Sequence, residues 1–279
     1  SGTLVNNWID FAGFKWRIIR TNSDGSIRII YNGNNYSQTG TGTQIGTSKF
    51  NANQGNNTYV GYMYGARSGT YSQTHENKNN STIKAYLDNW YKTNIEGKNY
   101  SQYVSSEAGF CNDRKVQNIG DGYTNNGTGT GRTGYAARYR LFDGNKYRNQ
   151  QTVTLDCSQS NDLFTIASSS KGNHALTYPI GLITSDEVVY AGGFGGTNNQ
   201  NYWLYTGQSY WTMSPSNYHG GGGAWPYEFY VNNGGLYGGN ISDNNNVTTY
   251  YGVRPVINLD KNVKLTGSGT TTDPFKIVE

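Results

Sequence analysis

The last third of the chain, residues 210–259, reads YWTMSPSNYHGGGGAWPYEFYVNNGGLYGGNISDNNNVTTYYGVRPVINL. Two apolar ends, 210–215 and 252–259, enclose a middle made almost entirely of Gly, Asn, Tyr and Ser. Alternating apolar residues predict strands with one buried side. We therefore expect a fixed frame around a middle segment whose residue types suit contact with a ligand.

The middle segment contains its own strand pattern. Trp225, Tyr227, Phe229 and Val231 alternate with Pro226, Glu228 and Tyr230, which predicts a strand with the first set buried and the second exposed. A turn is expected at 232–235, and Ile241 and Val247 are isolated apolar anchors in an Asn-rich loop. A closing strand should cover 253–259. Residues 210–259 are thus the expected ligand-binding segment.

Composition limits the class of protein. Only 14% of the 279 residues are charged, while there are 38 Gly and 25 Tyr, so amides, hydroxyls and backbone must solvate the surface. The net charge of +4 is scattered, which argues against nucleic acid. No apolar run approaches the roughly 20 residues of a membrane-spanning helix. The chain begins Ser1-Gly2-Thr3, and we expect membrane attachment only through a missing amino-terminal anchor.

The rest of the chain predicts an α+β fold in one domain, 1–279. Strands are expected at 8–11, 14–20 and 26–31, with a hairpin turn at 22–25. Apolar residues at three- and four-residue steps predict a helix over 81–93, and a second helix is expected over 185–191. Ser81 and Ser185 are the expected N-caps. Small antiparallel sheets and long irregular loops would surround these two helices.

Several segments show weaker patterns. Residues 32–74 are expected to be loop with one short strand at 59–64, and 162–166 to be a short strand. The tract 112–149 contains GTGRTG at 129–134, which fits the spacing of a nucleotide-binding loop, but no strand precedes it. We interpret the tract as a flexible surface loop. A last hairpin is expected from 263–265 to 273–278.

Two cysteines, Cys111 and Cys157, have no CxxC spacing and no neighbouring His. Such a pair is either a disulfide or two free thiols. The low charge and abundant Tyr, Asn and Gly resemble an extracellular protein, which favours the disulfide. Closing a loop of this length would stabilise the fold by roughly 4 kcal/mol in the chain-entropy model.

The sequence contains no recognisable catalytic set. His75, His174 and His219 lie far apart along the chain, and no P-loop, GxSxG, HExxH or zinc-ligand spacing occurs. Asp186 and Glu187 are adjacent in the first turn of the predicted helix, where the helix dipole already accounts for them. We therefore predict no enzyme activity, no cofactor and no metal.

Ligand binding agrees better with the residue types. Tyr and Trp offer rigid contact area, while Ser, Gly and Asn offer adaptable hydrogen bonds, as in antibody loops. Alternatively, loops of this composition simply keep a weakly charged β-rich protein in solution, and some of these Tyr residues belong to the core. The candidate ligand-binding residues are Asn217, Tyr218, His219, Trp225, Tyr227, Glu228, Tyr230, Asn232, Tyr237, Asn240, Asp243, Asn244 and Tyr250.

The two ends of the 210–259 segment resemble a known family. WTMSP at 211–215 and YGVRPVINL at 251–259 are similar to the carboxy-terminal segment of C-type-lectin-like domains, in particular the formylglycine-generating-enzyme type and the variable proteins of diversity-generating retroelements. WRIIR at 16–20 with Asp24-Gly25, and GSGT at 267–270 with DPF at 273–275, look like domains of surface and pilin-like proteins of gut Firmicutes.

The resemblance implies a C-type-lectin-like fold with two helices flanking small antiparallel sheets and a ligand face between Ser214 and Gly252. In the retroelement proteins, mutagenesis of Asn codons varies exposed positions while the scaffold is kept. The calcium-binding tripeptides of sugar-binding lectins are absent here. Both cysteines precede the carboxy-terminal part where formylglycine-generating enzymes carry theirs, which argues against that catalysis.

We therefore expect a secreted or surface-displayed, adhesin-like protein, extracellular or on the cell surface. It would bind with an Asn-, Tyr- and Gly-rich face, which the resemblance implies is hypervariable. Its expected partner is a protein or glycan on another cell or phage. A structural pilus or cell-wall domain without a specific ligand is one alternative. An enzyme of the formylglycine-generating type is the other.

Overall fold

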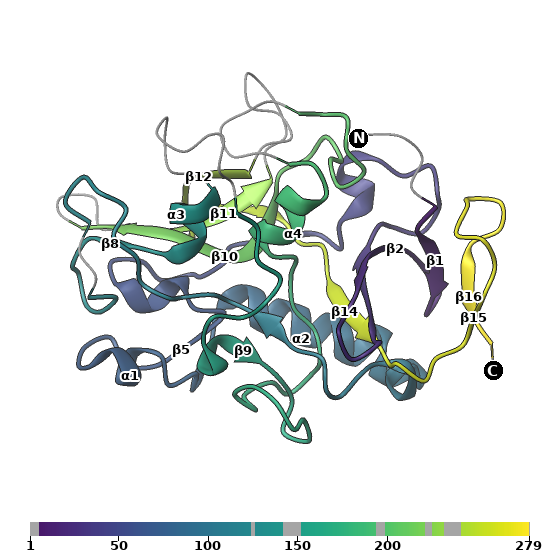
Figure 1. Cartoon of the computed structure of the whole chain (residues 1–279), viewed down its shortest axis with the longest axis horizontal. Helices are drawn as coiled ribbons and strands as arrows, with labels where there is room; N and C mark the ends of the chain where they lie inside the picture. The colour runs from purple at the N-terminus through teal and green to yellow at the C-terminus, as the bar shows by residue number, and fades with distance from the viewer. Residues whose placement is uncertain are drawn as a thin grey trace.

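A computed structural model of the chain describes residues 6–123, 126–141, 152–193, 199–220, 225–231 and 241–278, and of 241–245 it describes the backbone alone. Figure 1 shows two main sheets lying side by side, with the strands of the amino-terminal hairpin at one end of the molecule and β8, β10 and β11 at the other. The long helix α2 runs beneath both.

The first sheet contains the amino-terminal hairpin and the carboxy terminus. Its strands pair antiparallel, except that β1 and β16 run parallel. The predicted strands at 8–11, 14–20 and 26–31 and the closing hairpin are confirmed. In spatial order the strands are β14 (Val256–Leu259), β3 (Ile27–Tyr31), β2 (Phe14–Thr21), β1 (Trp8–Phe11), β16 (Phe275–Ile277) and β15 (Leu265–Thr266).

The second sheet is built around β10. One edge of β10 pairs with β11, while β13 and β8 pair with opposite ends of its other edge. Only the β10–β13 pair is parallel. The strands are β12 (Ile241–Asn246), β11 (Trp225–Val231), β10 (Tyr210–His219), β13 (Tyr251–Gly252), β4 (Thr47–Ser48) and β8 (Thr133–Gly134).

Short elements connect the two sheets. Two small sheets pair β5 (Met63–Tyr64) with β6 (Asn79–Asn80) and β7 (Phe110–Cys111) with β9 (Leu163–Phe164). The α-helices are α1 (Tyr71–Thr74), α2 (Thr82–Asn94), α3 (Ala136–Leu141) and α4 (Ser185–Tyr190). The 3₁₀ turns are η1 (Gly40–Thr43), η2 (Asn57–Val60), η3 (Glu96–Lys98), η4 (Ser101–Tyr103) and η5 (Ser160–Asp162).

Helix α2 forms where the spacing of apolar residues predicts it. The Ser81 side chain accepts a hydrogen bond from the Lys84 amide and so satisfies one of the free N–H groups of the first turn. Ile83, Leu87 and Tyr91 fall on one face and are buried. Burying each such side chain stabilises the fold by about 1.5–3 kcal/mol, so this face holds α2 against the sheets.

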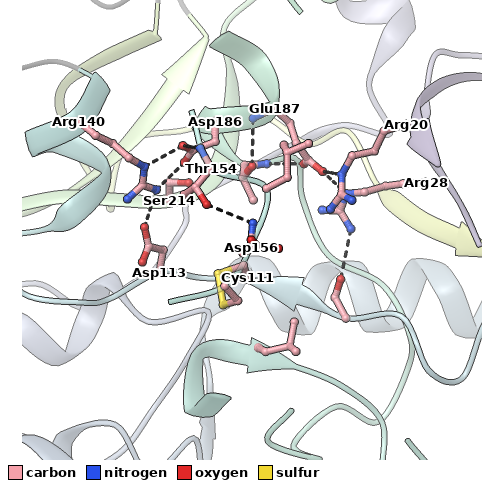
Figure 2. Close-up of a pocket in the computed structure, with 15 residues that line it drawn as sticks. Arg20, Arg28, Cys111, Asp113, Arg140, Thr154, Asp156, Asp186, Glu187 and Ser214 are labelled. Carbon is pink, nitrogen blue, oxygen red and sulfur yellow. Dashed lines mark hydrogen bonds and ion pairs between the residues drawn. A yellow bond between two sulfur atoms is a disulfide. The ribbon is translucent and has the colours of Figure 1, made fainter. Parts of the chain in front are cut away.

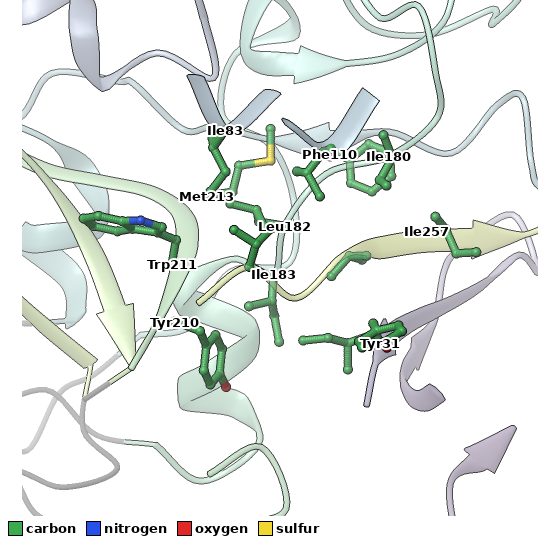
Figure 3. Packing of buried hydrophobic residues seen from close by; sticks show 14 of the residues in the cluster. Tyr31, Ile83, Phe110, Ile180, Leu182, Ile183, Tyr210, Trp211, Met213 and Ile257 are labelled. Atoms are coloured by element: carbon green, nitrogen blue, oxygen red, sulfur yellow. The ribbon is translucent and has the colours of Figure 1, made fainter. Parts of the chain in front are cut away.

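One hydrophobic cluster connects the elements, from Ile9 in β1 to Leu259 in β14. Figure 3 shows residues of β10, of α2 and of the segment before α4 meeting in it, among them Met213, Ile83 and Ile183. The fully buried Arg254 lies between the sheets, where its guanidinium donates to the carbonyl oxygens of Tyr31 and Leu204 at 3.2 Å each. It also donates from Nη2 to the side-chain oxygen of Asn32 at 2.7 Å, so neutral oxygens satisfy this buried cation.

Three local predictions are wrong. The N-cap of α4 is Thr184, because its hydroxyl and Glu187 form a reciprocal capping box, and Ser185 is the first helical residue. In β11, Trp225 is exposed while Glu228 and Tyr230 are buried, because helix and core cover both sides of the strand beyond Tyr227. The strand expected at 162–166 is shortened to β9, since η5 occupies 160–162.

The structure is mixed α+β, with several sheets, one long helix and irregular loops, which confirms the predicted class. The segments interpreted as loop contain more order than expected. Residues 32–74 hold η1, β4, η2, β5 and α1, and the tract 112–149 holds β8 and α3. Among the described residues, no helix has both the length and the apolar character to cross a membrane.

Candidate functional site

Strands β8, β10 and β11 form a three-stranded patch with two different faces. Tyr218 of β10 pairs with Pro226 of β11 and with Thr133 of β8, and all three side chains are buried. Since successive side chains point to opposite faces of a sheet, the neighbouring residues point the other way. We call this second side the outer face; its β10 and β11 residues are Asn217, His219, Trp225 and Tyr227.

Aromatic side chains cover part of the outer face. Trp225 is 44% exposed, and its ring meets that of Tyr227 edge to face with the centroids 6.5 Å apart. His219 is the cross-strand partner of Trp225 and is half-buried. An exposed Trp in contact with Tyr offers rigid contact area that no core packing explains.

A loop segment before β8 adds Tyr123 and Arg132 to the outer face. The Arg132 guanidinium lies 4.4 Å from the centroid of the Tyr123 ring, a cation–π contact. Nδ1 of His219 lies 3.3 Å from the Tyr123 hydroxyl and 3.4 Å from Nη2 of Arg132. These three side chains therefore form one cluster beside Trp225 and Tyr227.

The cluster has a polar floor. Asn217 donates from Nδ2 to the Tyr123 hydroxyl at 3.2 Å, and its Oδ1 accepts from Arg138 of α3 at 3.3 Å. Ser216 also donates to Oδ1 of Asn217 at 2.8 Å. Asn217 is only 4% exposed, so it acts as a support for Tyr123.

Buried Asn57 fixes the loop that carries Arg132. Its Nδ2 lies within hydrogen-bond distance of the carbonyl oxygens of Thr128 (3.1 Å), Gly129 (3.1 Å) and Gly131 (2.8 Å). Its Oδ1 accepts from the Tyr135 hydroxyl at 3.0 Å. The segment 128–131, interpreted from the sequence as a flexible surface loop, is therefore held by a fully bonded side chain.

The outer face contains four of the candidate ligand-binding residues: Asn217, His219, Trp225 and Tyr227. Tyr218, Glu228 and Tyr230 are buried, at 0%, 0% and 5% exposure, because they point toward the core and η2. Tyr250 is 64% exposed but lies elsewhere, with Lys49 above its ring. Asp243 and Asn244 lie in β12, where their side chains are outside the described residues, as are Asn232, Tyr237 and Asn240 entirely.

Glu228 has an unusual environment. It is fully buried, and neither carboxylate oxygen has a hydrogen-bond partner among the described residues. Burial raises the pKa of Glu228 well above its ordinary value, and the positive charge of Arg114 opposes this only in part. The side chain therefore stays protonated at pH values where an exposed Glu is ionised.

A second polar region surrounds the first turn of α4 and encloses a cavity of about 60 Å³. Figure 2 shows Asp186 held by Arg140, which also reaches Asp113, and Glu187 held by Arg20 and Arg28. The Arg140–Asp186 and Arg140–Asp113 contacts are both 2.6 Å. Asp186 and Glu187 are thus members of an ion-pair network, in addition to their favourable place in the helix dipole.

These ion pairs fix the charge states of their members. Burial alone would raise the pKa of Glu187, but the positive charges of Arg28 and Arg20 hold it below its ordinary value. Burial would likewise lower the pKa of Arg140, but its bonds to Asp186 and Asp113 raise it. The buried or half-buried charged groups of the region, Arg20, Arg28, Asp113, Arg140, Asp186 and Glu187, each have an opposite partner, which is the pattern of a structural network.

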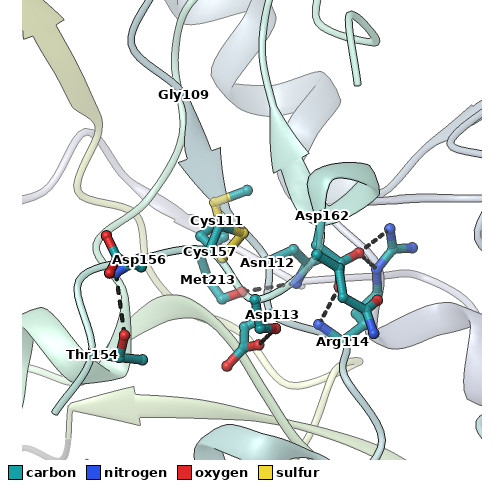
Figure 4. Close-up of a disulfide and its surroundings, with 12 residues drawn as sticks. Gly109, Cys111, Asn112, Asp113, Arg114, Thr154, Asp156, Cys157, Asp162 and Met213 are labelled. Carbon is teal, nitrogen blue, oxygen red and sulfur yellow. Dashed lines mark hydrogen bonds and ion pairs between the residues drawn. A yellow bond between two sulfur atoms is a disulfide. The ribbon is translucent and has the colours of Figure 1, made fainter. Parts of the chain in front are cut away.

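The predicted disulfide is confirmed and borders the same cavity. Cys111 and Cys157 are bonded, with their Cα atoms 5.5 Å apart. Figure 4 shows the bond beside Asn112 and Asp113, and Ser158 donates to Oδ1 of Asp113 at 2.7 Å. The bond therefore ties the segment after residue 152 to the end of β7. The described residues contain no free cysteine.

Sequence reasoning missed Tyr123, Arg132 and Arg138. All three belong to the Gly- and Asn-rich tract 112–149, whose composition conceals them. Thr133, Gly134 and Tyr135 are all buried and α3 follows at once, so their residue types form no alternating pattern that marks a strand in the sequence. Across the described part of the chain, no three His, Cys, Asp or Glu side chains lie close enough to hold a metal ion.

No protein-family model, curated protein or solved structure matches this chain. The geometry of the outer face is therefore the basis for assigning a function.

Proposed function

We propose that this chain is a secreted or surface-displayed, adhesin-like protein that binds a protein or glycan ligand with its outer face. The observation that carries the proposal is the juxtaposition of exposed Trp225 and half-buried Tyr227 with His219, Arg132 and Tyr123 on one side of three hydrogen-bonded strands. Hot spots of binding surfaces are enriched in the same Trp, Tyr and Arg side chains.

The rigidity of the outer face supports this proposal. Asn57 holds the loop before Arg132, and Asn217 holds the Tyr123 hydroxyl. Side chains that are already positioned lose little conformational entropy when a ligand binds. The outer face would therefore bind with its residues close to the positions that they occupy in the free protein.

We further propose that the fold is C-type-lectin-like and that 210–259 is its ligand-binding segment. Four residues of the outer face, Asn217, His219, Trp225 and Tyr227, fall between Ser214 and Gly252, where the resemblance expects a ligand face. Helices α2 and α4 beside small sheets agree with the same fold. The disulfide agrees with an oxidising, extracellular location.

The two alternatives make different predictions. A structural pilus or cell-wall domain would have no ligand that depends on the outer face. A formylglycine-generating enzyme would need a free thiol, and the Cys111–Cys157 bond weighs against it because neither sulfur is then a nucleophile.

The proposal is tested by screening the wild-type protein against arrays of glycans and of bacterial and phage surface proteins. Any ligand recovered should be lost in a Trp225→Ala, His219→Ala double variant whose melting temperature stays within a few degrees of wild type. Tyr86→Ala is the matched control, because Tyr86 is a 37% exposed aromatic on α2. A ligand that binds all three proteins equally would refute an outer-face site.

A further inference from the structure

A pocket of about 310 Å³ lies beside the β1–β2 turn, at the end of the molecule opposite β8. It is formed by the turn, by η4 and its preceding residue, and by β16. The side chains that give it its chemistry are Phe11, Phe14, Tyr100, Tyr103, Lys276 and Ile277. Its volume is at the lower end of the roughly 300–1,000 Å³ typical of small-molecule sites.

Aromatic rings form the floor and walls. Phe11 is 4% exposed, and its ring lies 5.5 Å from that of Tyr100 and 6.4 Å from that of Tyr103, edge to face in both cases. Tyr100 and Tyr103 are half-buried. Aromatic rings prefer such perpendicular or offset contacts, so a further flat ring would fit against the accessible parts of Tyr100 and Tyr103, which the buried Phe11 ring supports from behind.

The turn itself keeps this pocket apolar. Ala12 and Gly13 have φ of 53° and 83°, the left-handed backbone of a tight hairpin turn. Asn, Asp or Gly ordinarily occupies the first of these positions, since a Cβ is strained there. Ala12 is only 6% exposed and belongs to the hydrophobic core. Ala12 therefore adopts a strained backbone conformation, and its methyl group occupies a position where such turns usually have a polar side chain.

The rim carries an excess of positive charge. Asp10 is neutralised, because Oδ2 accepts from Lys15 at 2.9 Å and Oδ1 accepts from the Tyr36 hydroxyl at 2.6 Å. Lys276 is the cross-strand neighbour of Asp10, yet it is exposed and its ammonium group has no partner among the described residues. Since Lys15 is balanced by Asp10, Lys276 is the source of the excess charge among the residues that line the pocket.

We propose that this pocket binds a small aromatic carboxylate, with the ring against Tyr100 and Tyr103 and the carboxylate at Lys276. The apolar and aromatic lining favours a ring as one part of the ligand, and Lys276, which has no partner among the described residues, favours a negative charge as the other. The site is separate from the outer face and does not depend on the proposed function. The carboxylate belongs either to a free acid or to the carboxyl terminus of a peptide that ends in an aromatic residue.

The test is titration of the ¹⁵N-labelled full chain with 3-phenylpropionate, followed by NMR. We expect the chemical shifts of the amides of Ala12, Gly13, Tyr103 and Lys276 to change with added ligand until they saturate. The dissociation constant from these curves should be about 1 mM or below. The neutral alcohol 3-phenylpropan-1-ol should bind several-fold more weakly. If N-acetylphenylalanine binds more tightly than 3-phenylpropionate, the ligand is the carboxyl terminus of a peptide. If it binds more weakly, the ligand is a free acid.

Two variants complete the test. Lys276→Glu should weaken 3-phenylpropionate binding about tenfold, the equivalent of one charge-assisted hydrogen bond, and should fold normally because the side chain is exposed. Lys115→Glu makes the same charge change at another exposed lysine and should leave binding unchanged. Equal binding of the acid and the alcohol, an unchanged affinity in Lys276→Glu, or no saturable shift in the wild-type protein would each overturn the proposal.

Discussion

The side-chain amide of Asn57 donates to the main-chain carbonyl of Gly131 at 2.8 Å, one residue before Arg132. Asn57 is in η2, which packs beneath β10 and β11, whereas Arg132 is part of the outer face. This single buried side chain therefore connects the inner side of the sheet to the loop that carries a proposed contact residue. The position of Arg132 depends on a residue far away in sequence.

Substitution of Asn57 should loosen that loop. Asn57→Ala leaves the carbonyl oxygens of Thr128, Gly129 and Gly131 and the hydroxyl of Tyr135 without this partner. Unpaired buried groups cost about 1–3 kcal/mol each, and partial rehydration of the loop reduces the sum. We expect urea denaturation to show a loss of at least 2 kcal/mol, with faster amide exchange over 128–135. Asn53→Ala, at an exposed position, should change neither the free energy of unfolding nor the amide exchange over 128–135. If the amides of 128–135 in Asn57→Ala are as protected as in the wild type, Asn57 does not hold the loop.

Glu228 should make the protein less stable as pH rises. Its pKa is raised in the folded protein, so above the ordinary value of 4.5 the unfolded chain binds fewer protons than the folded one. The free energy of unfolding then falls by about 1.4 kcal/mol per pH unit until the folded pKa is reached. Glu228→Gln mimics the protonated form of the side chain and should remove this pH dependence of the free energy of unfolding. Its stability advantage over wild type should be near zero at pH 4 and grow toward pH 7, as measured by urea denaturation.

The matched control for Glu228 is Glu76→Gln, at an exposed carboxylate paired only with Lys78 on the surface. This substitution should change the free energy of unfolding only slightly, and by nearly the same amount at every pH. A Glu228→Gln variant that is less stable than wild type at pH 7 would show that the buried carboxyl is ionised and paired.

His75 should resist protonation. Burial, followed by the charge of Arg114, lowers its pKa to about 3. Nδ1 lies 2.8 Å from the carbonyl oxygen of Tyr71, which can only accept, so Nδ1 carries the proton of the neutral ring. Because the unfolded side chain titrates near 6.5, the free energy of unfolding should fall as pH drops below 6.5. NMR should find the His75 ring neutral down to about pH 4, and a midpoint between 6 and 7 would contradict this.

Removal of the disulfide should destabilise the whole chain. The bond joins two cysteines 46 positions apart in the sequence, and closing such a loop stabilises the fold by about 4 kcal/mol in the chain-entropy model. The Cys111→Ser, Cys157→Ser double variant should therefore unfold at lower urea concentration, and reductant should shift the wild-type protein in the same direction. Reductant should have no effect on the variant. Identical wild-type curves with and without reductant would show that the bond contributes nothing to stability.

Local patterns predicted much of the frame. The hairpin β2–β3, helix α2 with its Ser81 cap and the closing strand β14 each follow from short-range apolar spacing and turn residues, because such elements bury one face. The Cys111–Cys157 pairing was also predictable, since only two cysteines exist.

The outer face was predictable only in part. Alternation along β11 cannot tell which side of the strand meets the core, and the core and α4 together bury Glu228 and Tyr230 as well as Phe229. The pairing of β8 with β10 and the Asn57 bonds join residues more than 70 positions apart. A Gly- and Asn-rich tract gives no local sign of such contacts, which explains why Tyr123 and Arg132 were missed.

The most direct test of the proposed binding face is oxidative footprinting of the wild-type protein with and without a ligand recovered by screening, read by mass spectrometry. Trp225 is 44% exposed and Tyr250 is 64% exposed in the free protein, so both should react with hydroxyl radicals. If the outer face binds the ligand, Trp225 and His219 become protected while Tyr250 and Tyr86 react as before. Unchanged reactivity at Trp225, with protection elsewhere, would contradict the proposal.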